Sequence, residues 1–273
     1  MPQVMFATDF SPGSESAFVH ALALALVHAA DLAIVHVEPG DDPVDWNRYP
    51  GVRPRLTDWG LLPPGAGKAD VARELGVHVR KLAYGGRDPV KALERALNDR
   101  QPDLLVLGTS GATGLLGRSV SRAVARVAYV PTLVVPDGAP GFVRPADGAL
   151  SLRRALVGVD AEPDPRFAIA TAARLLRGLA SEGTEVDLLH VGPAEAMPHI
   201  PDAHLPAAKL TRTTRTGDAA TEIARRADEI DADVIVLATE GRQGLIDALR
   251  GRVTERVMAR ARRPVLSVPV AAV

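Results

Sequence analysis

Two glycine-containing turns are the segments of this sequence best suited to hold a ligand. The first, Gly108–Gly117, follows the apolar run Asp103–Leu107. The second, Gly241–Gly251, follows the similar run Asp233–Leu237. Glycine lets backbone N–H groups approach an anion closely, and a helix that begins after such a turn presents its positive end there. Because a helix-like segment follows each turn, each is predicted to form a cradle for a phosphate group.

An aspartate stands at the end of the first apolar run of each half of the chain. Asp9 follows Val4–Thr8, and Asp160 follows Ala155–Val159. In open α/β sheets ligands bind beyond the carboxyl ends of the strands, where both the aspartates and the glycine turns are expected. A carboxylate at that edge is suited to bind a metal ion or a ribose hydroxyl.

Other motifs compete for the same residues. Ala112–Ser119 resembles the mononucleotide loop G-x4-G-K-[ST] but lacks its first Gly and its Lys. Gly108–Ala112 resembles the nucleophile elbow of hydrolases but lacks the final Gly. His199 and His204 lie on either side of Pro201 and cannot share a helix face, which disfavours a metal site. The phosphate cradle is the preferred interpretation.

His36 and His190 each precede a valine at the end of an apolar run. We expect each to be a hydrogen-bonded histidine at a strand end rather than a ligand-binding group.

The composition narrows the class of protein. The chain has 273 residues, of which 47% are hydrophobic and 24% are charged, with a net charge of −1. These values are typical of globular proteins and disfavour a disordered chain, a coiled-coil rod or a binder of bulk nucleic acid. There is no cysteine, which excludes disulfides and thiol chemistry. Neither a membrane span nor a signal peptide is expected. The expected location is the cytoplasm.

The two halves of the chain show the same sequence pattern, as expected for an internal repeat. In each half, strand-like runs alternate with helix-like segments in the same order, which predicts parallel strands joined by helical crossovers. The expected fold class is α/β, as two tandem doubly wound sandwiches, each with a five-stranded parallel sheet. The expected domains are residues 1–138 and 152–273, joined by the Pro-, Gly- and Asp-rich linker Pro136–Leu152. Ser11 is expected to cap a helix that begins at Pro12.

One region breaks the symmetry between the halves. Pro39–Gly67 contains six prolines, five glycines and both tryptophans, Trp46 and Trp59. The corresponding stretch of the second half, Gly192–Pro206, is much shorter. We expect an irregular loop with a little helix whose Trp rings pack on the sheet; a lid or a partner surface is the alternative.

Several of these runs together resemble universal stress protein domains. The resemblance is carried by the opening runs, by the two His-Val strand ends, by the runs before the glycine turns and by the last strands. These segments are Val4–Pro12 and Leu156–Asp160, His36-Val37 and His190-Val191, Pro102–Gly111 and Ala232–Gly241, and Pro131–Val135 and Pro264–Val268. The resemblance covers nearly the whole chain and implies the fold described above, which is also that of adenine nucleotide alpha hydrolases.

One branch of that family binds ATP through a G-x2-G-x9-G-[ST] loop. In the first half Gly108 and Gly111 match its opening, but about three residues are absent before Arg118-Ser119. In the second half Gly241-x9-Gly251 keeps the long spacing, with Ala238 in place of the first Gly and Arg252 in place of the closing hydroxyl residue. Neither half has the intact motif.

The resemblance implies the following nucleotide-binding residues. In the first half they are Ala7, Thr8, Asp9, Val37, Leu107, Gly108, Gly111, Ser119 and Val120. In the second half they are Val159, Asp160, Val191, Ala238, Gly241, Gly251, Arg252 and Val253.

Two functions remain open from the sequence. One is a stress-response sensor or regulator that binds ATP, with or without Mg, through degenerate loops. The other is a nucleotide-free scaffold or interaction protein of the same fold. No complete catalytic set is present, so an enzyme is not expected, although slow ATP hydrolysis is compatible with the motifs. The strands Thr132–Val135 and Val265–Val268 are expected to pair within one chain as an internal pseudo-dimer of the two domains, and a homodimer is compatible with the sequence.

Overall fold

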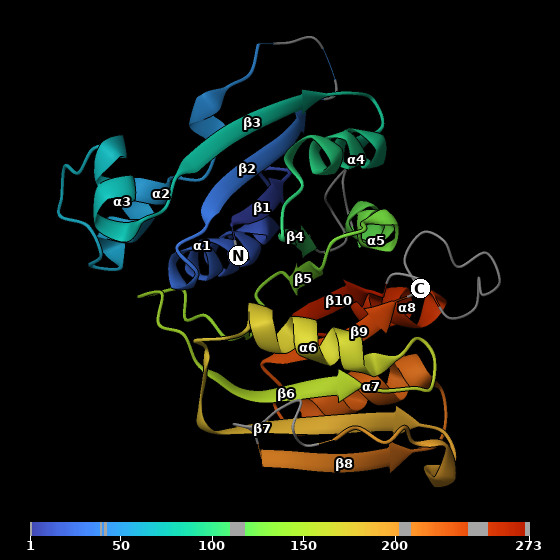
Figure 1. Cartoon of the computed structure of the whole chain (residues 1–273). Helices are drawn as coiled ribbons and strands as arrows, with labels where there is room; N and C mark the ends of the chain where they lie inside the picture. The colour runs from blue at the N-terminus through green and yellow to red at the C-terminus, as the bar shows by residue number, and fades with distance from the viewer. Residues whose placement is uncertain are drawn as a thin grey trace. The chain divides into compact units, whose positions relative to one another are not determined.

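The computed structural model describes residues 2–38, 40, 43–109, 118–201, 209–239 and 251–270. The chain divides into two compact units. Unit 1 comprises residues 1–124, 135–138 and 143–150, and unit 2 comprises residues 125–134, 139–142 and 151–273. Helices and strands alternate in both (Figure 1), so the predicted α/β class is confirmed.

Unit 1 contains a parallel sheet with the strand order β3-β2-β1-β4, beyond which β5 follows β4. The elements of the first half are β1 Gln3–Thr8, η1 Pro12–Ser14, α1 Glu15–Val27, β2 Asp31–Glu38, η2 Trp46–Arg48, α2 Val52–Asp58, α3 Lys68–Leu75, β3 Val79–Gly85, α4 Pro89–Arg100, β4 Leu104–Thr109, α5 Arg118–Val127 and β5 Thr132–Pro136. α1 packs against β1 and β4, whereas α4 packs against β2 and β3.

The centre of this sheet is the core of unit 1. β2 is buried from Leu32 to Val37, as its continuous apolar run predicts for a strand that is covered on both faces. The middle of α1, Ala17–Ala25, is buried as well, so this helix is enclosed on all sides.

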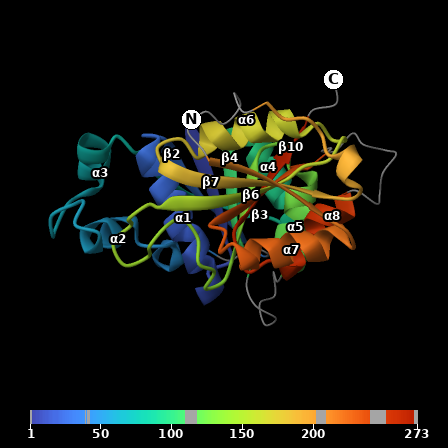
Figure 2. The same cartoon turned by 90° about the horizontal axis from the view of Figure 1, so that it is seen from below.

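Unit 2 contains a second parallel sheet with the equivalent strand order β10-β9-β6-β7-β8. Its elements are β6 Leu152–Gly158, α6 Pro165–Leu175, β7 Ala180–Val191, η3 Ala194–Ala196, β8 Lys209–Arg215, α7 Ala219–Glu229, β9 Val234–Thr239, α8 Gly251–Arg260 and β10 Val265–Pro269. α6 covers one face of this sheet, and α7 and α8 lie together on the other (Figure 2). The doubly wound arrangement is thereby confirmed.

The first residues of β5 belong to unit 2. There β5 pairs antiparallel with β10, with Leu133 opposite Leu266 and Thr132 opposite Ser267. This is the strand pairing that the sequence predicted. The domain limits 1–138 and 152–273, the pseudo-dimer of two domains and a homodimer stay predictions.

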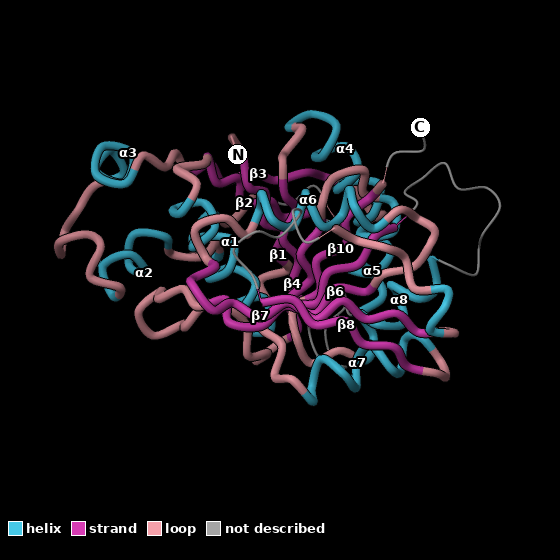
Figure 3. The backbone as a smooth tube through the Cα atoms, turned by 60° about the horizontal axis from the view of Figure 1, so that its bottom comes forward, coloured by secondary structure: helices cyan, strands magenta, loops and turns pink. Residues whose placement is uncertain are grey.

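The insert of the first half has the expected irregular course with short helices. α2 and α3 lie near each other (Figures 1 and 3). The expectation that both Trp rings pack on the sheet is wrong. Trp59 is buried against the segment before β6: its Nε1 donates to the carbonyl oxygen of Pro145 at 3.0 Å, and its ring lies over Gly148. Trp46 is 49% exposed and stacks on Tyr49.

The start of the first helix also differs from expectation. Ser11 makes no side-chain cap; its Oγ donates to Asp9 Oδ1 at 2.5 Å instead. The chain then makes the 3-10 turn η1, and the α-helix proper begins at Glu15. The local Asp-Ser pair competes with capping for the hydroxyl group. Within the described ranges, no helix has the length and apolar character needed to cross a membrane.

Candidate functional site

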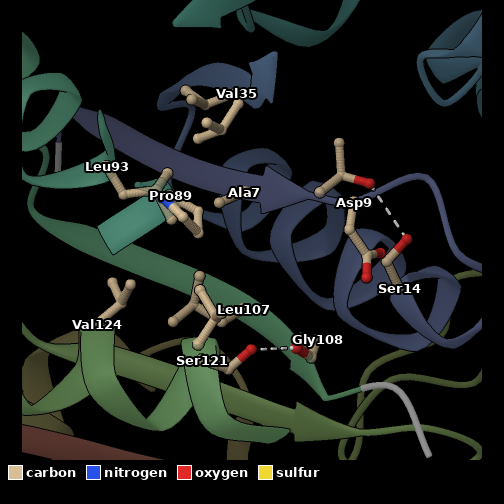
Figure 4. Close-up of a pocket in the computed structure, with 13 residues that line it drawn as sticks. Ala7, Asp9, Ser14, Val35, Pro89, Leu93, Leu107, Gly108, Ser121 and Val124 are labelled. Carbon is tan, nitrogen blue, oxygen red and sulfur yellow. Dashed lines mark hydrogen bonds between the residues drawn. The ribbon is translucent and has the colours of Figure 1, made fainter. Parts of the chain in front are cut away.

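A pocket opens at the carboxyl ends of β1, β2 and β4 in unit 1, bordered by α4 and α5 (Figure 4). Its volume is about 480 Å³, including space open to solvent. Its wall is mainly apolar, with hydroxyl groups and one carboxylate at the rim. The lining residues are Ala7, Thr8, Asp9, Ser14, Val35, Val37, Pro89, Leu93, Leu107, Gly108, Val120, Ser121 and Val124.

Gly108 lies where the end of β4 passes the start of α1. A Cβ atom at this position would lie 3.0 Å from Ser14 Cα and 3.2 Å from the carbonyl oxygen of Gly13. Ser121 Oγ of α5 donates to the carbonyl oxygen of Gly108 at 2.7 Å. The glycine is therefore needed for the close passage of two backbones, independently of any phosphate.

The polar rim is organised by short contacts after β1. Thr8 Oγ1 lies 3.2 Å from Ser14 Oγ and accepts a hydrogen bond from Phe10 N at 3.0 Å. Asp9 Oδ1 accepts from Ser11 N at 2.9 Å, which holds the carboxylate in an Asx turn beside the pocket. Hydroxyl and carboxylate oxygens at a pocket rim can hydrogen-bond the hydroxyl groups of a ligand.

Unit 2 has a pocket at the equivalent place, with a volume of about 620 Å³ including space open to solvent. It is formed by the ends of β6, β7 and β9 with α7 and α8. The lining residues are Gly158, Val159, Asp160, Glu162, Pro163, Leu189, Val191, Ala219, Ile223, Leu237, Ala238, Val253 and Thr254. The same structural positions therefore line a pocket in both repeats.

The structure brings most of the site residues predicted from the sequence together in these two pockets. In unit 1 they are Ala7, Thr8, Asp9, Val37, Leu107, Gly108 and Val120, and in unit 2 they are Val159, Asp160, Val191, Ala238 and Val253. Gly111 and Gly241 lie outside the described residues, as do most of Ala112–Ser119 and His204. Ser119, Gly251 and Arg252 lie in the first turns of α5 and α8, for which only the backbone is described.

The sequence did not point to the residues that α4 and α7 contribute. Pro89 and Leu93 of α4 line the first pocket, and Ala219 and Ile223 of α7 line the second. A signal was present, because an aspartate N-cap follows a strand in both halves. Asp88 caps α4 by accepting from Val90 N, and Asp218 caps α7 by accepting from Thr221 N.

The two strand-end histidines are hydrogen-bonded as expected. His36 Nδ1 lies 2.8 Å from the carbonyl oxygen of Thr8, and His190 Nδ1 lies 3.2 Å from that of Val159. The imidazoles thus tie the second strand of each repeat to the first. His36 also stacks on Phe10, with ring centroids 4.0 Å apart.

Two further observations limit the chemistry of the pockets. Over the part of the chain that the structure describes, no three His, Asp or Glu side chains are grouped so that they could hold a metal ion. An apolar slot with hydroxyl groups at its rim is suited to bind a planar, partly polar molecule.

Comparison with known proteins gives matches to one family. The model of the Universal stress protein family matches residues 1–136 and 201–269. No protein of curated function matches the sequence.

Solved structures share the fold over the whole chain. A universal stress protein from Archaeoglobus fulgidus DSM 4304 is 19% identical, with a TM-score of 0.64 over 98% of this chain and 98% of that one. A functionally unknown protein from Pseudomonas aeruginosa PAO1 is 18% identical, with a TM-score of 0.65 over 98% of this chain and 92% of the other. At these identities the likeness shows the fold.

Proposed function

The chain belongs to the universal stress protein family, and from this premise we propose that it is a stress-response regulator that binds an adenine nucleotide. The observation that carries the proposal is the duplicated pocket. The same strand ends and the same helix turns form an apolar slot in both repeats. We also propose that the protein is located in the cytoplasm.

The slot in each unit has an apolar wall of the kind that packs against a purine base. In unit 1 the slot is lined by Val35 and Val37 of β2, by Leu107 of β4 and by Leu93 of α4. Figure 4 shows Val35, Leu107 and Leu93 around it. Burying a planar base against such side chains releases water from apolar surface on both sides. In a slot that holds a base, the rim groups would then hydrogen-bond the ribose: Asp160 in unit 2, or Thr8 and Asp9 in unit 1.

The first turn of a helix borders each pocket. Val120 lies in the first turn of α5 and Val253 in the first turn of α8, and both line a pocket. The N-terminal turn of a helix carries unpaired N–H groups and a partial positive charge, which favour a phosphate. The phosphates of the nucleotide, with Mg where it is bound, would lie at these turns.

Thermal unfolding in the presence of Mg-ATP tests the proposal. At a ligand concentration about a thousand times Kd, binding stabilises the folded chain by about 4 kcal/mol, which is worth several degrees in Tm. The double variant Val120→Glu/Val253→Glu places a negative charge at both helix turns and should abolish the shift. Val27→Glu, at an exposed position on α1 outside the pockets, is the matched control. A wild-type chain that shows no shift and retains no nucleotide on purification would contradict the proposal.

The protein is proposed to act as a regulator rather than as a fast enzyme. None of the described pocket residues is a histidine. Of their three carboxylates, Asp9 and Asp160 accept hydrogen bonds from nearby backbone N–H groups, and the third is Glu162. A turnover above about 1 s⁻¹, the lower range of typical enzymes, would refute this part of the proposal.

The second candidate function is a nucleotide-free interaction protein. It is favoured by the insert of the first repeat, where Trp46 is half exposed on top of Tyr49. Partners that remain bound to a Gly108→Ala/Gly241→Ala variant and are lost from Trp46→Ala would favour this function.

A further inference from the structure

The two pockets differ in size, although most of their described lining residues occupy equivalent positions. The pocket of unit 1 has a volume of about 480 Å³ and that of unit 2 about 620 Å³. If the two were equivalent ligand sites, the side chains that line them should leave similar space. Comparing the described lining residues at equivalent positions shows which of them change in the direction of the larger pocket.

Most substitutions between the repeats would make the second pocket smaller, not larger. At three equivalent positions unit 2 has the bulkier residue: Leu189 in place of Val35, Ala238 in place of Gly108 and Thr254 in place of Ser121. Val37 and Val191 are identical, as are Val120 and Val253, and Leu93 and Ile223 are isomers. None of these positions accounts for the larger space in unit 2.

At two equivalent positions unit 2 has the smaller residue, but at one of them the smaller residue adds no space to the pocket. Gly158 replaces Ala7, but the position of its missing Cβ is already taken, because Leu237 Cδ2 lies only 2.6 Å from it. Some described lining residues have no counterpart in the other pocket, namely Ser14 and Val124 in unit 1 and Glu162 and Pro163 in unit 2. Among the equivalent positions, the other one with a smaller residue in unit 2 is the first residue of the helix that borders the slot. It is Pro89 in α4 and Ala219 in α7.

Pro89 occupies the mouth of the slot in unit 1. Figure 4 shows its ring beside Ala7 and Leu93, on the side where α4 faces the strand ends. The proline ring fills space that a methyl group leaves open in unit 2. From this position Pro89 narrows the slot between α4 and the strands.

We infer that the first residue of this helix decides which repeat accepts a base: Ala219 leaves the slot of unit 2 open to adenine, whereas Pro89 closes the slot of unit 1. The inference rests on the proposed nucleotide binding and deepens it, since it makes one adenine nucleotide per chain the binding stoichiometry. Unit 1 then has the fold and the rim of a nucleotide site without the room for the base.

Both residues can be exchanged without breaking the helices. Each follows an aspartate N-cap with extended backbone, Asp88 with ψ 104° and Asp218 with ψ 117°, which is the conformation required before a proline. The first helical position needs no N–H group, so proline and alanine are both accepted there. The capping bonds to Val90 N and Thr221 N do not involve the exchanged residues.

Titration calorimetry of the full chain with Mg-ATP tests the inference. The wild type should bind one nucleotide, Pro89→Ala should bind two, and Ala219→Pro should lose its site, with affinity weakened at least about tenfold, equivalent to 1.4 kcal/mol. Ala219→Leu fills the same part of the slot of unit 2 without introducing proline. It therefore gives a second measurement of nucleotide binding if Ala219→Pro does not fold. Val27→Glu should bind as the wild type does.

The double exchange Pro89→Ala/Ala219→Pro should bind one nucleotide, moved to unit 1. Photolabelling with 8-azido-ATP and peptide mapping locates it. Two wild-type sites, an unchanged Ala219→Leu variant, or one site in Pro89→Ala would overturn the inference while nucleotide binding stands. A wild-type chain that binds no nucleotide would instead overturn the proposed function, and the inference with it.

Discussion

His20 is a buried titratable group in the middle of α1. Its Nδ1 lies 2.6 Å from the carbonyl oxygen of Ser16. Burial lowers the pKa of His20 from 6.5 to about 4, although the bond to Ser16 opposes the shift. Since the folded chain holds this imidazole neutral, the unfolded chain binds more protons between these two pH values. The free energy of unfolding should therefore fall as pH is lowered from about 6.5 to 4, by about 3 kcal/mol.

Urea unfolding of the wild type and of His20→Leu at pH 7 and pH 4.5 measures this contribution. The His20→Leu variant should lose much of the pH dependence over this range, because its side chain does not titrate. His78→Ala, which removes an exposed histidine from the same unit, is the control and should keep that dependence. Equal pH dependence in His20→Leu and the wild type would show that His20 does not produce it.

Gly108 is predicted to be a structural requirement as well as a pocket residue. In Gly108→Ala the new methyl group would lie 3.0 Å from Ser14 Cα, so the backbone of η1 or β4 must move. We expect a loss of about 1–3 kcal/mol in the free energy of unfolding, the usual cost of overpacking. Gly85→Ala, at the end of β3 with nothing within 4 Å of the new Cβ, should cost less. Urea denaturation measures both, and equal stabilities would refute the close approach of the two backbones.

Residue types at strand ends could be predicted from sequence, but the opposite wall of the pocket could not. Asp9, Val37 and Asp160 stand directly after or within clear apolar runs, and parallel strands bring such ends together. Pro89 and Ala219 lie at helix starts far from those runs in sequence. Only the packing of α4 and α7 against the strands reveals that Pro89 borders the slot of unit 1 and that Ala219 borders the slot of unit 2.

At the scale of elements, the insert of the first repeat gives the clearest test. Gly148 has a φ of +70°, and a Cβ there would lie 2.5 Å from the Trp59 ring. Gly138 has a similar φ of +62° with nothing within 4 Å. Alanine at either position should cost roughly 1–2 kcal/mol for the left-handed backbone. Gly148→Ala should cost more, because it also displaces the indole.

Tryptophan fluorescence in a Trp46→Phe background reports on Trp59 alone. Gly148→Ala should shift its emission to longer wavelength as the ring becomes exposed, whereas Gly138→Ala should leave the emission unchanged. An unchanged spectrum in Gly148→Ala would mean that the packing of α2 on the 143–150 segment tolerates the methyl group.

The elements that the sequence predicted least well are those without periodicity. Apolar runs in the sequence locate β1, β2, β4, β5, β6, β9 and β10 to within a few residues. They locate only the end of β7 and do not locate β8, whose residues are mostly polar. In the insert, Trp59 could be recognised from the sequence as an apolar residue, but the sequence did not show where it would be buried. Its partner, the segment around Gly148, belongs to the stretch Pro136–Leu152, which is rich in Pro, Gly and Asp and was predicted only to be a linker.

At the scale of the whole molecule, the duplication was legible because two sets of motifs recur in the same order. The repeat also predicted that the last strands would pair, and β5 lies antiparallel to β10 with Leu133 opposite Leu266. What the repeat did not reveal is that residues 125–134, which belong to the first copy by sequence, are part of unit 2 by packing. The boundaries of the sequence repeat therefore do not coincide with the boundaries of the compact unit.

Two fragments test this difference. Residues 152–273 form a complete second repeat by sequence but lack β5, so the backbone groups of β10 that pair with Thr132–Val134 lose their partners. An edge strand with Val265 and Leu266 buried in the full chain is prone to pair with another copy. We expect this fragment to self-associate, with sedimentation that depends on concentration. The fragment 118–273, which retains α5 and β5, should stay monomeric under the same conditions and unfold at a higher temperature. If the shorter fragment is monomeric and equally stable, residues 125–134 do not contribute to the folding of unit 2.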